Sequence, residues 1–291
     1  MSSTPYVFYS YSIINYQSDE EVHPSKHFLI FKSVHKAPIA YRKQDPSEAD
    51  KDTQLVVLKD MKIGQKQVIT FFISRQIVER QINLYRKNKD EVELGVEKTD
   101  DTSLTRFVVV PHLKKMAIQD KSGEHFINAN SAISRLKKIL SEVAEHTLIS
   151  EYAASAEDVR KALAAWKIDE VNFTARPFNP HPSTPGDIFS AQMAENNSIV
   201  TGRVKAKKGV LEHIKKGFIG EILGLSEKGY ADIGAKGKTQ QGHVAQIIKS
   251  NPFEDVNAPR KIRIMMPERG EVSSHIEDIV EAMEQIYGKN P

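Results

Sequence analysis

Cysteine is absent from the 291-residue chain. This absence excludes disulfides, thiolate zinc sites, iron–sulfur ligation and a cysteine nucleophile. It also fits a reducing compartment, where disulfides do not persist. Hydrophobic residues make up 40% and charged residues 27% of the chain, close to the globular average, so the sequence predicts a folded protein with a substantial core.

Long hydrophobic runs are also missing. The apolar run 68–73 is far shorter than the roughly 18 residues that a membrane helix needs. The first residues, MSSTPYVFYSYSII, place no basic leader before their apolar stretch, so no signal peptide is expected. We therefore expect a cytoplasmic protein without a membrane partner.

Motifs that bind cofactors or metal ions are scarce. No Gly-x4-Gly-Lys-Ser/Thr pattern occurs, because the leading glycine of the stretch 234–239 is misplaced for a P-loop. The ten histidines are scattered along the chain, and His181 has no acid or second histidine nearby. We predict no cofactor and no metal site, and we identify no catalytic residue.

The triplet Asp60-Met61-Lys62 supports one enzymatic alternative. With Asp50 and Asp52 upstream, it is similar to a metal-dependent nuclease core, in which carboxylates hold the ion and a lysine steadies the attacking water. A solvated turn between two strands, completed by Gly64, explains the same residues. We expect the turn, and a metal-dependent nuclease stays open as an alternative function.

Patterning in the first half of the chain indicates an antiparallel sheet with helices. Runs of β-forming and aromatic residues, separated by polar segments, predict strands at 6–16, 28–34, 55–58, 68–73, 91–96, 105–110 and 116–119. A short helix is predicted at 75–87. A longer one follows Asn130 or Ser131, where apolar residues recur at spacings of three and four. The loops are too short for crossovers, so the strands are expected to be antiparallel.

The second half mixes helices and strands. Ser155, followed by Glu157 and Asp158, predicts the start of a helix over 156–166. The other predicted elements are strands at 170–176, 200–206, 230–233 and 261–266, helices at 187–195, 210–225 and 274–287, and a proline-rich loop at 176–186. The sequence thus predicts an α+β fold in two domains, a β-rich α+β domain over residues 1–150 and a mixed α+β domain over 151–291.

Positive charge is concentrated in one segment, 203–249, which we call the basic segment. It carries ten Lys or Arg and four Asp or Glu, a net charge of +6, whereas residues 1–202 are neutral and residues 250–291 carry −3. Such a concentration is the pattern expected for an anionic partner. Glycines interleaved with the lysines let the backbone approach a phosphate.

Lysine outnumbers arginine in the basic segment. Lysine acts on phosphate as a point charge, whereas reading of base edges favours arginine, so we expect little sequence specificity. Tyr230 offers a ring for stacking on a base, while Phe218 fits core packing better. The residues predicted to contact nucleic acid are Arg176, Arg203, Lys205, Lys207, Lys208, Lys215, Lys216, Lys228, Tyr230, Lys236 and Lys238.

Two stretches resemble a known family. The turn Phe178-Asn179-Pro180-x-Pro182 after a strand, with the helix that follows, and the later Glu227-Lys228-Gly229 resemble phage exclusion proteins of the RexA family and related uncharacterised bacterial and prophage proteins. The resemblance covers a quarter of the chain. It implies a two-part α+β dimer that binds DNA with little sequence preference and acts in phage exclusion, and it carries over no catalytic residue.

These observations predict a sequence-nonspecific nucleic-acid-binding protein, with duplex DNA favoured over RNA, acting in phage defence or exclusion. A homodimer is expected, because the apolar elements 6–16 and 274–287 can each pair with a second copy. A protein-interaction subunit, whose lysines only keep it soluble, stays open beside the nuclease as an alternative.

Overall fold

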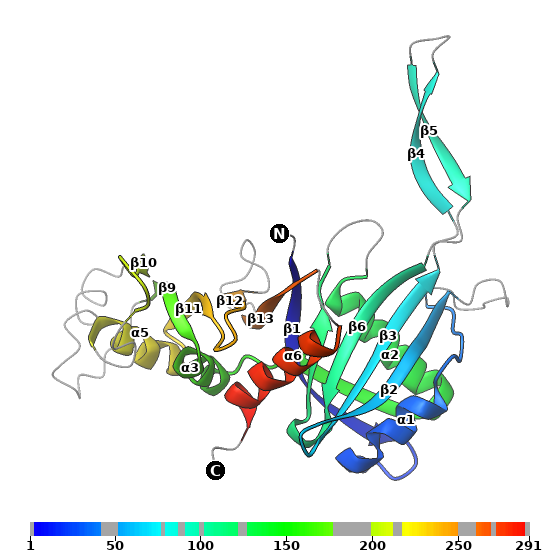
Figure 1. The fold of residues 1–291 in the computed structure, drawn as a ribbon, viewed down its shortest axis with the longest axis horizontal. Helices are drawn as coiled ribbons and strands as arrows, with labels where there is room; N and C mark the ends of the chain where they lie inside the picture. Colours follow the sequence, from blue (N-terminus) through cyan, green and yellow to red (C-terminus); the bar gives the residue numbers. More distant parts are fainter. Residues whose placement is uncertain are drawn as a thin grey trace. The chain divides into compact units, whose positions relative to one another are not determined.

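The computed structural model describes residues 3–41, 52–76, 79–86, 91–98, 102–121, 127–176, 199–211, 217–249, 260–268 and 272–288. Within these ranges the fold is α+β and dominated by antiparallel strands, which confirms the predicted class (Figure 1). Eleven of the described strands belong to one sheet, and two more form a separate pair. No helix in these ranges has the length and apolar character to span a bilayer.

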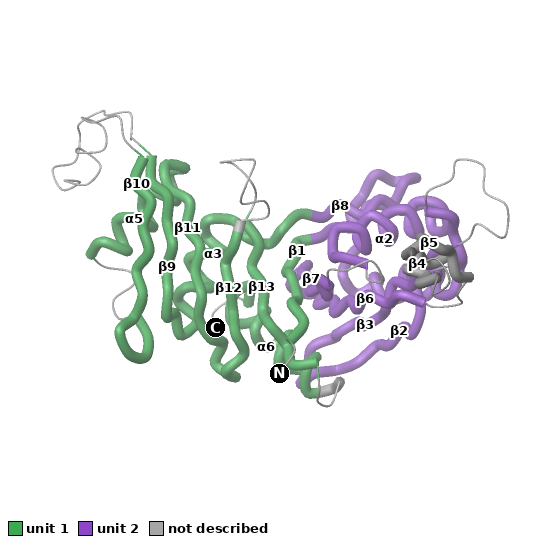
Figure 2. Tube along the Cα trace, turned by 90° about the horizontal axis from the view of Figure 1, so that it is seen from above, with its two compact units in different colours: residues 1–10, 151–291 green, residues 11–150 purple. Residues whose placement is uncertain are grey.

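The chain divides into two compact units (Figure 2). Unit 1 consists of residues 1–10 and 151–291, and unit 2 consists of residues 11–150. The sequence placed residues 1–10 with the first half of the chain, whereas in the structure they group with the second half. The reason is strand β1 (Ser3–Asn15), whose first residues pair with a strand near the other end of the sequence.

Unit 2 is built around the second part of β1. Its sheet runs in the order β1-β7-β6-β3-β2, and β8 also pairs with β1. Its elements are η1 (Pro24–Lys26), α1 (His27–Ser33), β2 (Thr53–Ile63), β3 (Lys66–Gln76), β6 (Thr102–Val110), η3 (Pro111–Leu113), β7 (Lys115–Gln119), α2 (Ala129–Ala144) and β8 (His146–Tyr152), with the separate pair β4 (Glu79–Arg86) and β5 (Glu91–Lys98). Phe31 of α1 contacts Phe71, which stacks on Phe107, with ring centroids 4.9 Å apart in both pairs, so aromatic rings join α1 to the sheet.

Three predictions in unit 2 were wrong. The apolar run 28–34 is helix α1 and not a strand, because His27, Ile30 and Phe31 are buried at helical spacing. The predicted helix 75–87 is the end of β3 followed by β4, which pairs antiparallel with β5. Asp60 and Lys62 do not lie on a turn but within β2, and the turn itself contains Gly64 with a φ of +61°.

Unit 1 combines a sheet with three described helices. The strand order is β10-β9-β11-β12-β13-β1. The elements are α3 (Ala156–Ala165), β9 (Lys167–Ala175), β10 (Val200–Lys205), α5 (Gly217–Glu227), β11 (Ala231–Lys238), β12 (Val244–Lys249), β13 (Arg260–Pro267) and α6 (Val272–Tyr287). Helix α5 packs on β9 and β11, and α3 packs on α5 and α6, so the helices form one layer against the sheet (Figure 1).

The start of α3 agrees with the sequence prediction. The Ser155 hydroxyl accepts a hydrogen bond from the Asp158 backbone N–H, and the Asp158 carboxylate accepts one from the Ser155 N–H. Two other predictions needed correction, because α5 begins at Gly217 and β11 continues to Lys238. The predicted helix 187–195 and most of the proline-rich loop, with His181, lie outside the described residues.

Candidate nucleic-acid interface

One face of the unit 1 sheet lies opposite the helix layer, and we call it the open face. Paired residues on neighbouring antiparallel strands point to the same side of a sheet. Phe173 pairs with both Gly202 and Ile233, and its ring contacts Phe218 of α5 with centroids 5.3 Å apart, which marks the helix-covered side. The alternate positions form the open face: Lys167, Glu170, Asn172 and Thr174 of β9; Thr201, Arg203 and Lys205 of β10; Asp232, Gly234, Lys236 and Lys238 of β11; Gln246 and Ile248 of β12; and Lys261 and Arg263 of β13.

Basic side chains cross the open face in a row. Lys205 pairs with Glu170, which pairs with Lys236. Lys236 pairs with Gln246, which pairs with Arg263 and accepts a hydrogen bond from its Nε at 2.8 Å. Neighbouring strands lie about 4.8 Å apart, so the row from β10 to β13 spans roughly 19 Å. Phosphates of one strand of duplex DNA recur about every 3.4 Å along the helix axis, so this length covers several successive phosphates.

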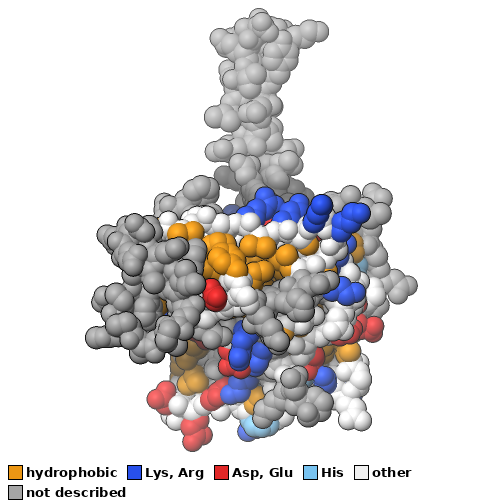
Figure 3. Space-filling view, turned by 90° about the vertical axis from the view of Figure 1, so that its left-hand side faces the viewer, with side chains coloured by type: hydrophobic (Ala, Val, Ile, Leu, Met, Phe, Trp, Pro, Cys, Tyr) orange, Lys and Arg blue, Asp and Glu red, His pale blue; other side chains and the backbone are white. Residues whose placement is uncertain are grey.

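Three exposed lysines of the open face are available for a partner, two in the row and Lys238 beside it on β11. Lys205, Lys236 and Lys238 are exposed and form no ion pair with any described residue. Lys238 pairs in register with exposed Lys167, which widens the basic area. Figure 3 views the molecule from the side of β10 and α5, and shows Lys and Arg side chains in a row above a group of hydrophobic side chains.

The two carboxylates of the open face are neutralised by arginines. Glu170 accepts a hydrogen bond from Arg203, and this bond lowers the pKa of the Glu170 carboxyl. Asp232 lies 3.1 Å from Nη2 of Arg176 and 4.0 Å from Nη2 of Arg260. Arg176 and Arg203, both predicted to contact nucleic acid, are therefore engaged within the protein, and the lysines carry the unpaired charge.

The remaining predicted residues divide between the two ends of the strands. Lys207 and Lys208 are exposed on the turn after β10, near the Lys205 end of the row. Lys228 and Tyr230 lie between α5 and β11, and the Tyr230 carbonyl accepts a hydrogen bond from the Arg176 backbone N–H at 2.9 Å. Arg176 follows the last residue of β9, so these two residues lie at the end of β9 that is far from Lys205. Lys215 and Lys216 lie outside the described residues.

Sequence reasoning missed three basic residues of the open face, Lys167, Lys261 and Arg263. The signal for two of them was present, since Lys261 and Arg263 alternate with the buried Ile262 and Ile264 in a strand that the sequence predicted. Their alignment with the row depends on the pairing of β12 with β13, and β12 was not predicted.

The nuclease alternative finds no assembled site among the described residues. Asp60 accepts two hydrogen bonds from the side-chain amide of Gln67, both at 3.1 Å. Asp52 instead lies 3.3 Å from buried Arg135. The described residues contain no group of three His, Asp or Glu side chains arranged to hold a metal ion, and Asp50 lies outside them.

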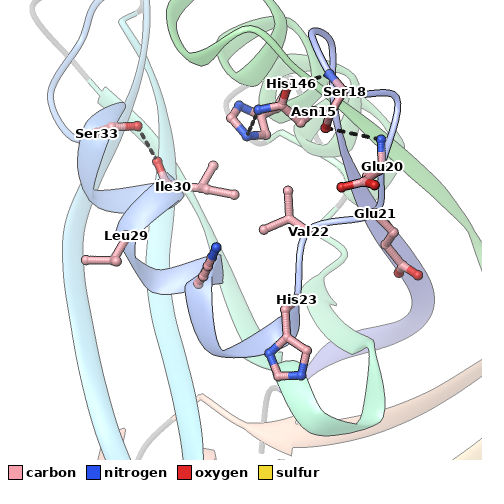
Figure 4. A pocket seen from close by; sticks show the side chains of 11 residues that line it. Asn15, Ser18, Glu20, Glu21, Val22, His23, Leu29, Ile30, Ser33 and His146 are labelled. Atoms are coloured by element: carbon pink, nitrogen blue, oxygen red, sulfur yellow. Dashed lines mark hydrogen bonds between the residues drawn. The ribbon is translucent and has the colours of Figure 1, made fainter.

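A cavity of about 550 Å³ lies in unit 2 (Figure 4). Val22 and Ile30 face one another across it, with His146 at one end and His23 at the other. Its lining includes the carboxylate of Glu20, whose negative charge opposes phosphate binding. This cavity is therefore not part of the candidate interface.

No protein-family model matches the chain, and a search of curated proteins finds no match.

Proposed function

We propose that the protein binds nucleic acid through the open face of unit 1, contacting phosphates with little regard to base sequence. Duplex DNA is the favoured partner, and the setting is phage defence or exclusion. The observation that carries the binding proposal is a group of three lysines on the open face, Lys205 of β10 with Lys236 and Lys238 of β11, which form no ion pair with any described residue. The setting is supported only by the resemblance to phage exclusion proteins.

Charge arithmetic on the open face supports a polyanionic partner. Its carboxylates, Glu170 and Asp232, each have an arginine partner, so they do not cancel the lysines. Phosphate contacts by lysine release counterions, and log K then falls with log salt by about 0.9 per contact on duplex DNA. Affinity is expected to depend little on the base sequence, because the unpaired cations are lysine ammonium groups, which do not make the bidentate contacts of arginine.

The test compares two triple variants of the whole chain. In the first, Lys205, Lys236 and Lys238 are changed to alanine. In the matched control, Lys26→Ala, Lys32→Ala and Lys62→Ala remove three exposed lysines from unit 2. Fluorescence anisotropy with duplex DNA is followed from 50 to 200 mM salt. We expect the first variant to lower the salt slope by about 2.7, for all duplex sequences alike, and the control to leave it unchanged.

Two results would contradict the proposal. A wild-type protein that binds no nucleic acid at low salt would remove it and favour the protein-interaction alternative. A loss of affinity confined to one sequence would show that bases, and not phosphates, are read.

A further inference from the structure

A groove of about 610 Å³ opens on the open face where β9, β10 and β11 lie side by side. Gly234 lies in its floor, opposite Asn172 in the register, and contributes no side chain. A Cβ at this position would lie 3.1 Å from the carbonyl oxygen of Ile247 and would also fill the floor. The volume falls in the range of roughly 300–1,000 Å³ that is typical of small-molecule pockets.

The walls of the groove offer neutral hydrogen-bonding groups beside apolar surface. The hydroxyls of Thr174 and Thr201 lie 3.4 Å apart. Asn172 donates one N–H to Glu170 at 3.2 Å, which leaves its carbonyl oxygen and second N–H for a ligand. Ile248 supplies apolar surface on the β12 side. Donors and acceptors of this kind next to an apolar surface match the edge and the face of a nucleobase.

The charges around the groove favour a ligand with one anionic end. Asp232 lines the groove, but Arg176 and Arg260 offset its negative charge. Arg203 lines the side toward β10, and Lys205 follows it along the same strand on the same face. Arg203 is paired with Glu170, so, among the described residues, Lys205 is the free cation at this end. A phosphate next to Lys205 would leave the ring of the ligand toward Gly234, so the groove combines the features that a nucleotide needs.

A base in an intact duplex cannot reach such a groove. Its edge is paired and its faces are stacked, and removing it from the stack costs a few kcal/mol, least where the base has no partner. A duplex lying on the lysine row can therefore fill the groove only where it carries an unpaired nucleotide.

We propose that the groove seats one unpaired nucleotide, with its base over Gly234 and Ile248 and its phosphate beside Lys205. Asn172 and the two threonine hydroxyls bind the edge of the base. This inference rests on the proposed function for the flanking duplex, which lies on the lysine row. It goes further by naming the feature that the open face selects, an unpaired nucleotide, supplied by a bulged strand or as a free mononucleotide.

The experiment uses the full chain and three labelled duplexes of equal length. One is perfectly paired, one carries a single bulged nucleotide, and one carries an abasic residue at the bulge. Anisotropy titrations at one salt concentration are expected to show the bulged duplex binding about tenfold more tightly than the other two, which is the scale of one well-placed set of base contacts. Unlabelled nucleoside monophosphates, added as competitors, are expected to remove this excess and leave binding of the perfect duplex.

Two variants connect the preference to the groove. Thr174→Phe fills it and is expected to abolish the tenfold preference. Thr102→Phe adds the same side chain at an exposed strand position of unit 2 and is expected to keep the preference. Asn172→Val removes hydrogen bonds without filling the groove, and is expected to reduce the preference several-fold. Fluorescence of Trp166, the single tryptophan, checks that unit 1 is folded in each variant.

The outcomes separate this inference from the proposed function. Equal affinity of the wild-type protein for the three duplexes would overturn the inference about the groove and leave the proposed nonspecific binding intact. A preference that survives both Thr174→Phe and Asn172→Val would place the unpaired nucleotide elsewhere and would also overturn it. Binding of monophosphates, lost in Thr174→Phe, without binding of any duplex would remove the proposed function alone, and no binding of any probe would remove both.

Discussion

Gly237 and Gly224 are expected to respond in opposite directions to the same substitution by alanine. Gly237 lies in β11 at a register shift against β9. A Cβ there would lie 2.5 Å from the carbonyl oxygen of Lys167 and 2.9 Å from Cα of Ile168, both backbone atoms of the neighbouring strand. Gly224 lies inside α5, and a Cβ there would meet nothing within 4 Å.

The magnitudes follow from these two environments. Forcing a methyl group against the β9 backbone costs about 1–3 kcal/mol, and the reduced freedom of the unfolded chain returns about 0.4–1 kcal/mol. Gly237→Ala is therefore expected to lower the free energy of unfolding by about 1–2 kcal/mol. Gly224→Ala meets no steric cost and is expected to raise it by about 0.5–1 kcal/mol, because alanine favours the helix.

Urea denaturation followed by fluorescence measures both changes in unit 1. Trp166 is the single tryptophan and is 5% exposed, so its emission reports the unfolding of this unit. A Gly237→Ala protein as stable as the wild type would refute the reasoning, because it would mean that β9 and β11 do not approach as closely as the register requires. A Gly224→Ala protein less stable than the wild type would refute the helical assignment of that position.

Three further predictions concern the pH dependence, the backbone and the assembly of the protein. The ring nitrogens of His27 form hydrogen bonds with the Tyr11 hydroxyl at 2.8 Å and the Val22 carbonyl at 3.0 Å, and burial lowers the pKa of this histidine. The stability that neutral His27 contributes is therefore present at neutral pH and is lost as pH falls below about 6.5, where the unfolded chain binds the proton first. Urea midpoints by circular dichroism between pH 7.5 and pH 5 are expected to fall more steeply for the wild type than for His27→Gln, and equal slopes would contradict this. Val57 is a β-branched residue at a φ of +53°, so Val57→Asn is expected to raise the free energy of unfolding by about 1 kcal/mol in thermal melts, and a lowered value would show that the position is not strained. Light scattering at micromolar concentration is expected to give twice the chain mass of 32.8 kDa, and a monomer mass would remove the proposed homodimer.

Sequence patterns located elements whose signal is local. The strand at 261–266 and the helix 156–166 were predictable, because alternation and a capping serine lie within the element itself. Helix α1 was missed because it has only seven residues, and its apolar run Phe28–Phe31 also fits a buried strand. Strand β4 was missed because it pairs with β5, and the residues of one strand do not show which segment pairs with it.

The candidate interface shows the same division. The concentration of lysine was visible in the sequence, but the row depends on registers that join Lys205 to Lys236 across β9, 31 positions apart in the chain. The sequence also assigned the glycines to phosphate approach. The position of Gly237 has another explanation, since its missing side chain admits the backbone of β9. Arg176 looked available in the sequence, and only the structure shows its ion pair with Asp232.

The path of β1 has a consequence for how the chain folds during synthesis. Ser3 pairs with Pro267, and Val7 pairs with Arg263, so the first part of β1 must wait for more than 250 further residues to leave the ribosome. Residues 11–150 contain their own sheet partners and can close earlier. At about 5–20 residues per second, residues 3–7 lack their β13 partner for roughly 13–50 seconds, a stretch that includes Tyr6 and Val7, both buried in the folded protein. Residues 3–7 of β1 are thus the part of unit 1 that a chaperone has the longest time to bind.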